Sequence, residues 1–315
     1  MKLAIVYNPN DNKLLSSAYS WTYRDMFLAI LERFAPVLHV TEACEATSIE
    51  ADAILFYDVH SSHHIEIEGI EKHPAVKLEY FNDPHQKEQA GTYRSTGQKF
   101  HKLGPEQRCK RAIKRGVRYI ICPYKNGYEK YIKPCAGYIE LIWSPIAPKN
   151  RIERPLPLSI REAASVAGTG HLWQGENGFR PYEFRNWAYK QPQITYLEHG
   201  INSRTPKGIY YQAFLSRFAG AAAFCDCYVV PKYLEIPMAG CVCFCQMHDE
   251  YTRMGFVDGV NCIAVNQKNF NERVKEFLAD PCKYQSIADA GRKQALNYTA
   301  DKFADKLYEF LVSII

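Results

Sequence analysis

The sequence predicts an α/β protein with two doubly wound parallel sheets, and three observations lead to this prediction. Apolar segments of strand length alternate with segments of helical periodicity over residues 1–143, and the alternation starts again near residue 164. Residues 144–157 lie between them and are rich in proline and charge, which is typical of a linker. A length of 315 residues suits two domains of about 150 residues each.

The elements of the first half follow from short apolar runs and from apolar residues at helical spacing. The run Leu3–Val6 begins the first strand, and Trp21, Met26, Phe27 and Ile30 repeat as one helix face. By the same criteria, strands are expected at 2–8, 37–40, 53–57, 76–81, 119–122 and 139–143, and helices at 17–34, 65–72, 105–115 and 128–133.

The second half repeats this order. Strands are expected at 164–167, 193–197, 221–225, 241–245 and 262–265, and helices at 180–190, 210–218, 232–239, 269–278, 281–297 and 299–313. The predicted domains are 1–150 and 151–298, with a last helix at 299–315 that crosses back to the first domain. Because ligands bind beyond the carboxyl ends of parallel strands, we expect the site in a cleft between the two domains.

Composition excludes several classes of protein. The net charge of +5 permits an anionic substrate without requiring nucleic acid. No apolar run reaches the roughly 18 residues that a membrane-spanning helix needs, and the first residues predict a buried strand instead of a signal peptide. Eleven cysteines without a Cys-x-x-Cys pair indicate reduced, buried thiols in a cytoplasmic protein with no metal site.

The segment 228–245 carries the most informative pattern. Lys232 and Glu235 lie one turn apart at the start of a short predicted helix, and Gly240 ends that helix before an apolar strand. A lysine at a helix start suits a phosphate, and a carboxylate nearby suits ribose hydroxyls. Taken alone, the same spacing is also that of a surface salt bridge.

A wider set of segments resembles the C-terminal domain of GT-B glycosyltransferases, in the retaining family-4-like group and its spore-maturation glycosyltransferase branch. The matching segments are Lys232–Gly240, Phe256–Val265, Val274–Pro281 and Ile287–Arg292, preceded by Ser165–Gly170 and Tyr182–Arg185. The resemblance covers residues 160–315 by sequence and residues 1–150 by topology alone. It implies two Rossmann-like domains and transfer from a nucleotide-sugar donor, a UDP-, GDP- or ADP-sugar.

The resemblance also implies which residues hold the donor. They are Gly168, Thr169, Gly170, Arg185, Lys232, Glu235 and Gly240, with Arg180 as the alternative to Arg185. Lys232, Arg185 and the amides of 168–170 would meet the diphosphate, and Glu235 the ribose. No Asp-x-Asp motif occurs, so metal-independent transfer without a further cofactor is expected.

One position departs from the family pattern. Retaining relatives carry two glutamates separated by seven residues; Glu235 fits the second, and Cys227 stands where the first would be. Retention of configuration is still the expectation from the resemblance. The departure leaves the sugar open and supports a rival reading, in which the protein is a non-catalytic GT-B relic that binds a nucleotide or an anionic polymer.

Polar loops after two strands of the first half supply acceptor-side candidates. Asp83, His85 and His60 are the candidate catalytic residues, since acidic and imidazole groups after a strand can take part in proton transfer. His63 and His64 are further acceptor-side candidates, and an ordinary loop is the alternative for all of them.

The stretch 99–118 is the most basic of the chain. Its residues Lys110, Arg111 and Lys114 are candidates for guiding an anionic acceptor such as DNA, although a solvated helix face is the simpler interpretation. If DNA is the acceptor, the chain would be a phage-type enzyme that glycosylates hydroxymethylated bases. The acceptor and the oligomeric state stay open.

Overall fold

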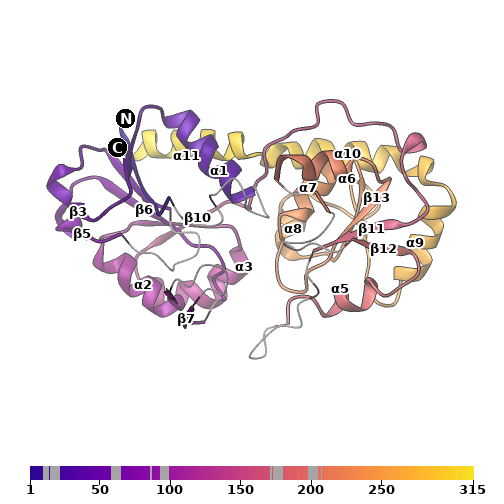
Figure 1. The fold of residues 1–315 in the computed structure, drawn as a ribbon, viewed down its shortest axis with the longest axis horizontal. Helices are drawn as coiled ribbons and strands as arrows, with labels where there is room; N and C mark the ends of the chain where they lie inside the picture. The colour runs from indigo at the N-terminus through magenta and orange to yellow at the C-terminus, as the bar shows by residue number, and fades with distance from the viewer. Residues whose placement is uncertain are drawn as a thin grey trace. The chain divides into compact units, whose positions relative to one another are not determined.

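The chain forms two compact units, each with its own parallel sheet (Figure 1). This computed structural model describes residues 1–9, 14, 22–57, 65–85, 87–92, 99–170, 172, 180–197, 205–206 and 208–315. Within that part, the first unit takes its residues from 1–15, 23–145 and 301–315, and the second from 16–22 and 146–300.

The first unit is built on a six-stranded parallel sheet in the order β10-β9-β6-β4-β1-β2. Its strands are β1 Leu3–Val6, β2 Val37–Val40, β4 Ala53–Phe56, β6 Val76–Tyr80, β9 Tyr119–Cys122 and β10 Glu140–Trp143. β1, β4 and β9 are buried along their whole length, as expected of central parallel strands covered on both faces. Their continuous apolar sequence is the reason that they were predictable.

The helices of the first unit are α1 Thr22–Phe34, α2 Pro105–Lys114, α3 Lys125–Gly127, a π-helical turn Tyr128–Ile132, α4 Lys133–Ala136 and the C-terminal α11 Ala300–Ile314. α11 lies beside α1 (Figure 1), where Arg33 makes an ion pair of 2.7 Å with Asp305 and stacks on the ring of Tyr308. The ring of Phe310 packs edge-on against Tyr119 of β9. The last helix therefore belongs to the first unit.

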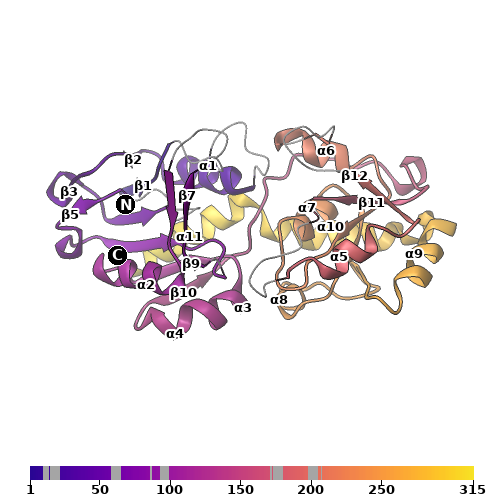
Figure 2. The same cartoon turned by 60° about the horizontal axis from the view of Figure 1, so that its bottom comes forward.

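The second unit has a five-stranded parallel sheet in the order β12-β11-β13-β14-β15. Its strands are β11 Val166–Thr169, β12 Ile194–Leu197, β13 Gly220–Ala223, β14 Val242–Cys245 and β15 Ile263–Ala264, and its helices are α5 Glu183–Ala188, α6 Tyr211–Leu215, α7 Lys232–Met238, α8 Asp249–Arg253, α9 Phe270–Ala279 and α10 Gln285–Ala295. α7 and α10 lie side by side (Figures 1 and 2). A cluster of aromatic rings around Phe224, Phe244 and Phe277 fills the core.

Two arginines, the buried Arg161 and the half-buried Arg292, hold residues 152–156 within the second unit. Arg161 donates to the carbonyls of Leu156, Phe218 and Ala239, so one guanidinium joins three separate segments. Arg292 of α10 donates to the carbonyls of Ile152 and Met238. The two arginines therefore hold this proline-rich segment through its backbone carbonyls, and these contacts do not depend on the side chains of the segment.

The prediction of two parallel α/β sheets is confirmed, and one predicted helix is wrong. Residues 65–72 form the short strand β5 Ile67–Glu68, which pairs with β3 Cys44–Glu45, followed by a 3-10 turn Ile70–Lys72. Gly69 between them has φ +76°, a left-handed conformation that no helix accommodates in its interior. The isoleucine spacing was helical, but the glycine divides the segment.

The prediction missed a hairpin, one helix and several single turns. The hairpin strands are β7 Gln89–Thr92 and β8 Lys99–Lys102, and α8 follows β14 directly. The other 3-10 turns are Ala46–Ser48, Leu158–Ile160, Gly208–Tyr210, Pro281–Tyr284 and Leu296–Tyr298. These segments are short and rich in polar residues, so neither periodicity gave a signal.

Most of the cysteines are buried, as predicted, but not all. All eleven are free; Cys241, Cys243 and Cys245 are no more than 1% exposed, whereas Cys44, Cys135 and Cys227 are half-buried and Cys282 is exposed. Across the described ranges, no group of three or more His, Cys, Asp or Glu side chains could hold a metal ion. In the same ranges, no helix is both long and apolar enough to cross a bilayer.

A buried ion-pair cluster joins α2 to the sheet of the first unit and predicts a stability effect. Glu79 of β6 is fully buried and accepts from Arg111 at 2.5 Å and from Arg115 at 3.5 Å. Glu79→Gln removes the buried negative charge that both guanidinium groups contact, so we expect the free energy of unfolding to fall by about 3 kcal/mol. Urea unfolding followed by circular dichroism measures it.

The control for Glu79→Gln is Lys110→Ala on the same helix. Lys110 pairs with Glu106 on an exposed face, where water screens the charges, so no measurable change in stability is expected. Equal losses in both variants would contradict the assignment of Glu79 as a buried anchor.

Candidate functional site

The candidate site of the second unit lies where β11 ends. The carbonyl of Thr169, the last residue of the strand, accepts hydrogen bonds from the ammonium group of Lys232 and from the hydroxyl of Tyr189 (3.0 Å). The hydroxyl of Thr169 bonds that of Tyr211 at 2.7 Å. Lys232 begins α7, so the first turn of this helix is directed to the carboxyl end of the sheet.

A second cation, Arg185, lies against the first. Arg185 on α5 is 3% exposed, and its guanidinium donates to the carbonyl of Phe224 at 2.5 and 2.8 Å and stacks on the ring of Tyr182 at 3.6 Å. Burial lowers the pKa of Lys232 well below its ordinary value of 10.5; the charge of Arg185 lowers it further, and Glu235 acts in the opposite direction. Arg185 is buried and Lys232 is half-buried, and two neighbouring cations repel each other, so their arrangement favours an anion between them.

Gly170 makes the approach to these cations possible. Its φ is +102°, and a Cβ at this position would lie 2.4 Å from Nζ of Lys232 and 3.4 Å from a guanidinium nitrogen of Arg185. Its carbonyl accepts from the hydroxyl of Tyr196 at 3.1 Å, which fixes the turn. Bare backbone beside two cations is the usual geometry for receiving a phosphate group.

Glu235 completes the first turn of α7. Its Oε1 accepts a hydrogen bond of 2.9 Å from the hydroxyl of Thr22, a residue grouped with the second unit. The negative charge of Glu235 contributes to raising the pKa of Tyr211, whose main cause is burial, so this tyrosine stays neutral. The structure brings together Thr169, Gly170, Arg185, Lys232 and Glu235, and their role in donor binding stays a prediction.

Two predicted donor-site glycines and one arginine have other roles. Gly168 lies inside β11 between Tyr196 and Ala222, and a Cβ there would come within 2.8 Å of Ile194. Gly240 follows the end of α7 with φ +75°, where glycine terminates helices. The alternative Arg180 is an exposed side chain paired with Glu183 at 3.1 Å.

Cys227 stands where the family pattern expects a glutamate, and the adjacent carboxylate is that of Asp226. Asp226 is exposed, and its two oxygens accept from the amide of Phe184 at 3.3 Å and from the side chain of Gln246 at 2.7 Å. Sequence reasoning missed His248, whose imidazole Nε2 lies 2.5 Å from the carbonyl of Cys225 beyond β13 and whose pKa is lowered by burial. Its position after the strand β14 was the available signal.

The tyrosines of the site were also missed. Tyr182, Tyr189 and Tyr211 each hold a predicted residue in place, through a ring face or a hydroxyl. The only signal in the sequence was the high number of tyrosines, 22 in 315 residues. Their roles depend on contacts between distant segments, which spacing does not reveal.

The first unit places Asp83 and His85 directly after β6, at the carboxyl end of its sheet. Both side chains are half-buried, and Asp83 has φ +47°, in the left-handed region that aspartate seldom occupies. Nδ2 of Asn82 donates to the Asp83 carboxylate at 2.8 Å. The candidates His60, His63 and His64 lie outside the described residues.

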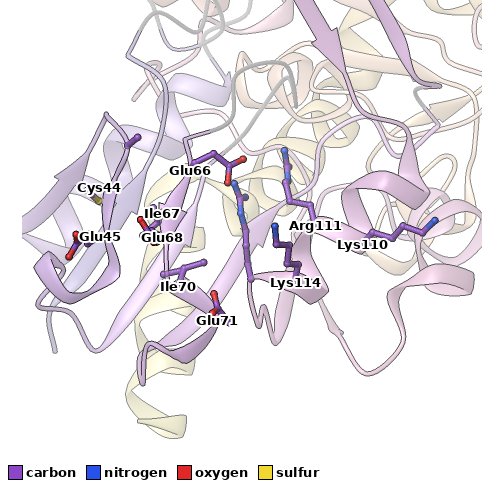
Figure 3. A pocket seen from close by; sticks show the side chains of 13 residues that line it. Cys44, Glu45, Glu66, Ile67, Glu68, Ile70, Glu71, Lys110, Arg111 and Lys114 are labelled. Atoms are coloured by element: carbon purple, nitrogen blue, oxygen red, sulfur yellow. The ribbon is translucent and has the colours of Figure 1, made fainter.

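The basic candidates of α2 line a cleft of about 760 Å³ in the first unit. Figure 3 shows Lys110, Arg111 and Lys114 on α2, with Glu66 and Glu71 among the other labelled side chains of the lining. Arg111 is mostly buried against Glu79, which corrects its prediction as a surface cation. Because glutamates line the same cleft, it lacks the uniformly positive charge that a polyanion needs.

No protein-family model and no curated protein matches the chain. Among solved structures, HepE of Anabaena in complex with UDP and glucose aligns with a TM-score of 0.58 and 12% identity over 99% of this chain and 100% of that chain. The DNA-modifying enzyme beta-glucosyltransferase aligns with a TM-score of 0.58 and 12% identity, covering 99% of both chains. Sucrose-phosphate synthase from Thermosynechococcus elongatus gives 0.54 at 8% identity over both whole chains.

These likenesses confirm the predicted GT-B fold with two Rossmann-like sheets. At such low identity they establish the fold alone. The spore-maturation branch that the sequence resembles stays a prediction.

A single methyl group at Gly170 tests the anion site. In Gly170→Ala the new Cβ displaces the flexible end of Lys232, so we expect UDP affinity to fall at least about tenfold, or about 1.4 kcal/mol. The positive φ should cost about 1 kcal/mol of stability in addition. Calorimetric titration with UDP and urea unfolding measure the two effects.

Gly259→Ala is the matched control for Gly170→Ala. Gly259 has φ +72°, and a Cβ at this position would have nothing within 4 Å. An alanine there therefore has the backbone strain of a positive φ but makes no new side-chain contact. We expect a similar loss of stability with unchanged UDP affinity. A loss of affinity in both variants would show that the effect of Gly170 is general destabilisation.

Proposed function

We propose that this protein is a glycosyltransferase that moves a sugar from a nucleotide-sugar donor to the hydroxyl group of an acceptor. The observation that carries the proposal is the pair of neighbouring cations, the half-buried Lys232 and the buried Arg185, beside the bare backbone of Gly170 at the carboxyl end of β11. In an open α/β sheet, this is the edge at which phosphate-bearing ligands bind. A pocket for a neutral ligand would gain nothing from the repulsion between these two charges.

The proposed donor is a UDP-sugar, ahead of the GDP- and ADP-sugars that the sequence leaves open. Two structures of HepE that share this fold along the whole chain contain UDP or UDP-glucose. In this chain, Lys232 and Arg185 would hold the diphosphate and Glu235 would accept from the ribose hydroxyls. The Thr22 hydroxyl that now bonds Glu235 shows that the carboxylate is placed to accept from an O–H group.

The proposed chemistry depends on charge development. The bond between the sugar and the diphosphate breaks, the acceptor oxygen bonds the anomeric carbon, and the negative charge on the diphosphate grows. Cations fixed beforehand stabilise that charge without reorganising, and two of them in a partly buried site supply what Mg²⁺ supplies in other transferases. Metal-independent transfer is therefore part of the proposal.

The stereochemical course follows from where the acceptor proton goes. Retention, which the sequence resemblance implies, allows the departing diphosphate to take the proton on the same face. Inversion needs a base on the acceptor side, for which Asp83 is the candidate in the first unit. The anomer of the product, determined by NMR, distinguishes the two courses.

Donor binding and turnover test the function directly. A thermal-shift panel with UDP, GDP, ADP and their glucose conjugates should single out one base, because a ligand at about 100 times its Kd adds about 2.7 kcal/mol of stability. Release of nucleotide from the selected donor should then be measurable. Binding without turnover of any donor would favour the rival, a non-catalytic relic.

Removing the lysine charge should weaken donor binding. Lys232→Ala loses one charge-assisted contact, worth about 1.5–3 kcal/mol, so UDP affinity should fall about 10–150-fold. Calorimetric titration measures it, and Lys190→Ala, which removes an exposed lysine just beyond α5, should bind UDP as the wild type does. Unchanged affinity in Lys232→Ala would remove the central support for the donor site.

The lowered pKa of Lys232 also predicts proton uptake on binding. In the free protein the pKa of Lys232 lies below 10.5. A bound diphosphate favours the ammonium form, so the pKa of Lys232 is higher in the complex than in the free protein. The affinity for UDP therefore falls as the pH rises from the pKa of the free protein to the pKa of the complex. Titrations of UDP in buffers of different ionisation enthalpy count the protons. The uptake should disappear in Lys232→Met; its persistence would assign the proton to another group.

A second candidate acceptor is DNA that carries hydroxymethylated bases. The observation in its favour is the match in length and fold with the T4 phage beta-glucosyltransferase, TM-score 0.53 over 97% of this chain and 99% of that chain. Incubation of hydroxymethylated and unmodified DNA duplexes with the donor found above tests it. Transfer to the hydroxymethylated duplex alone supports this acceptor, and transfer to neither duplex rejects it.

A further inference from the structure

A buried asparagine in the first unit supports the candidate base. Asn82 directly follows β6 and is 0% exposed. Its Oδ1 accepts from the hydroxyl of Tyr23 at 3.1 Å, and its Nδ2 donates to Oδ2 of Asp83 at 2.8 Å. The first hydrogen bond orients the amide, so its NH₂ group has to face Asp83.

Arg108 of α2 fixes the backbone at the same point. It is 2% exposed, its guanidinium lies 4.1 Å from the centre of the Phe81 ring, and it donates to the carbonyl of Asn82 at 2.6 Å and to that of Tyr80 at 3.4 Å. The sequence placed Arg108 in a basic stretch, but the structure uses it as a clamp on the end of β6. Both the backbone and the side chain of Asn82 are therefore held.

The backbone of Asp83 explains why such support is needed. Its φ of +47° is unfavourable for a residue with a side chain, and such conformations persist only where the surroundings hold them. The donated hydrogen bond from Asn82 favours the ionised carboxylate, the form that a base requires. Strained backbone beside a supported carboxylate is a common feature of functional sites.

The tyrosine hydroxyl groups near Asp83 are neutral. Tyr80 of β6 and Tyr124 after β9 both have a pKa raised well above 10.0, chiefly by burial, and the charge of Asp83 adds to each shift. Tyr23 of α1 is 6% exposed, and its carbonyl accepts from the hydroxyl of Tyr57 at 2.9 Å. Among the described residues, His85 is a further titratable group on the same loop, and the guanidinium of Arg108 is held by the carbonyls of Tyr80 and Asn82.

We propose that Asn82 is the positioning residue that holds Asp83 as the base for the acceptor hydroxyl. The inference rests on the proposed glycosyl transfer in its inverting course, the one of the two courses that needs a base on the acceptor side. In the step, the acceptor O–H loses its proton to the Asp83 carboxylate, the oxygen bonds the anomeric carbon, and the diphosphate leaves with the electron pair of the broken bond. Asn82 itself touches neither substrate and acts only through Asp83.

A double-mutant cycle on the release of UDP from UDP-glucose, with water as the acceptor, tests this role. Asp83→Asn should lower kcat about 10²–10⁴-fold, and Asn82→Ala about 10²-fold, with the KM for UDP-glucose unchanged in both. If Asn82 acts through Asp83, the double variant is no slower than Asp83→Asn alone. The proposal would be overturned if the fold losses in kcat of the two single variants multiply in the double variant, or if Asn82→Ala keeps the wild-type kcat.

Tyr23→Phe keeps the test decisive if Asn82→Ala does not fold. It removes the hydroxyl that orients the amide of Asn82 and that also hydrogen-bonds Tyr124. We expect kcat to fall about tenfold when residue 83 is the native Asp, and not to fall in the Asp83→Asn variant. An equal loss in both backgrounds overturns the proposal. If the wild type releases no nucleotide from any donor, the proposed function itself is rejected. If the wild type is active but the losses in kcat of the single variants add in the double variant, only the role of Asn82 is rejected.

Discussion

The repulsion between two neighbouring cations, the buried Arg185 and the half-buried Lys232, is the constraint on which the candidate donor site depends. Lys232 and Arg185 are held near each other by carbonyl oxygens, those of Thr169 and Phe224, that project from the ends of neighbouring strands. Parallel strands end with their carbonyls at one edge, so the sheet itself supplies the acceptors that keep both cations in place. The helix α7 must then begin at this edge, which places Glu235 one turn further along.

The same use of cations as backbone clamps recurs in both units. Arg161 and Arg292 gather the carbonyls of residues 152–156 in the second unit, and Arg108 holds the end of β6 in the first. A guanidinium has five donors in a fixed plane, so one arginine can satisfy several carbonyls where no regular hydrogen-bond ladder exists. Much of the positive charge of this chain therefore serves its architecture and is not available to a ligand.

The sequence predicted the sheets well because buried parallel strands are short apolar runs. β2 and β9 have the predicted bounds, and the start of α7 at Lys232 was correct to the residue. The predicted helix at residues 65–72 is wrong because the backbone of Gly69, and not the isoleucine spacing, decides the conformation of this segment. The hairpin β7–β8 was not predicted because its residues show no apolar alternation.

The candidate sites were predictable only in part, for a related reason. Lys232, Glu235 and Gly170 occupy spacings that have a local meaning, so the sequence pointed to them. Asn82, Tyr23 and Arg108 come from three elements, and their contacts exist only after the chain has folded. A side chain that is important because of a distant partner leaves no pattern along the sequence.

The lowered pKa of Lys232 has a chemical consequence beyond ligand binding. At neutral pH a larger share of this side chain is present as the free amine than for an exposed lysine, and the free amine is the nucleophile. An aldehyde or activated ester that reaches Lys232 would therefore meet a larger share of the reactive amine there than at an exposed lysine at the same pH.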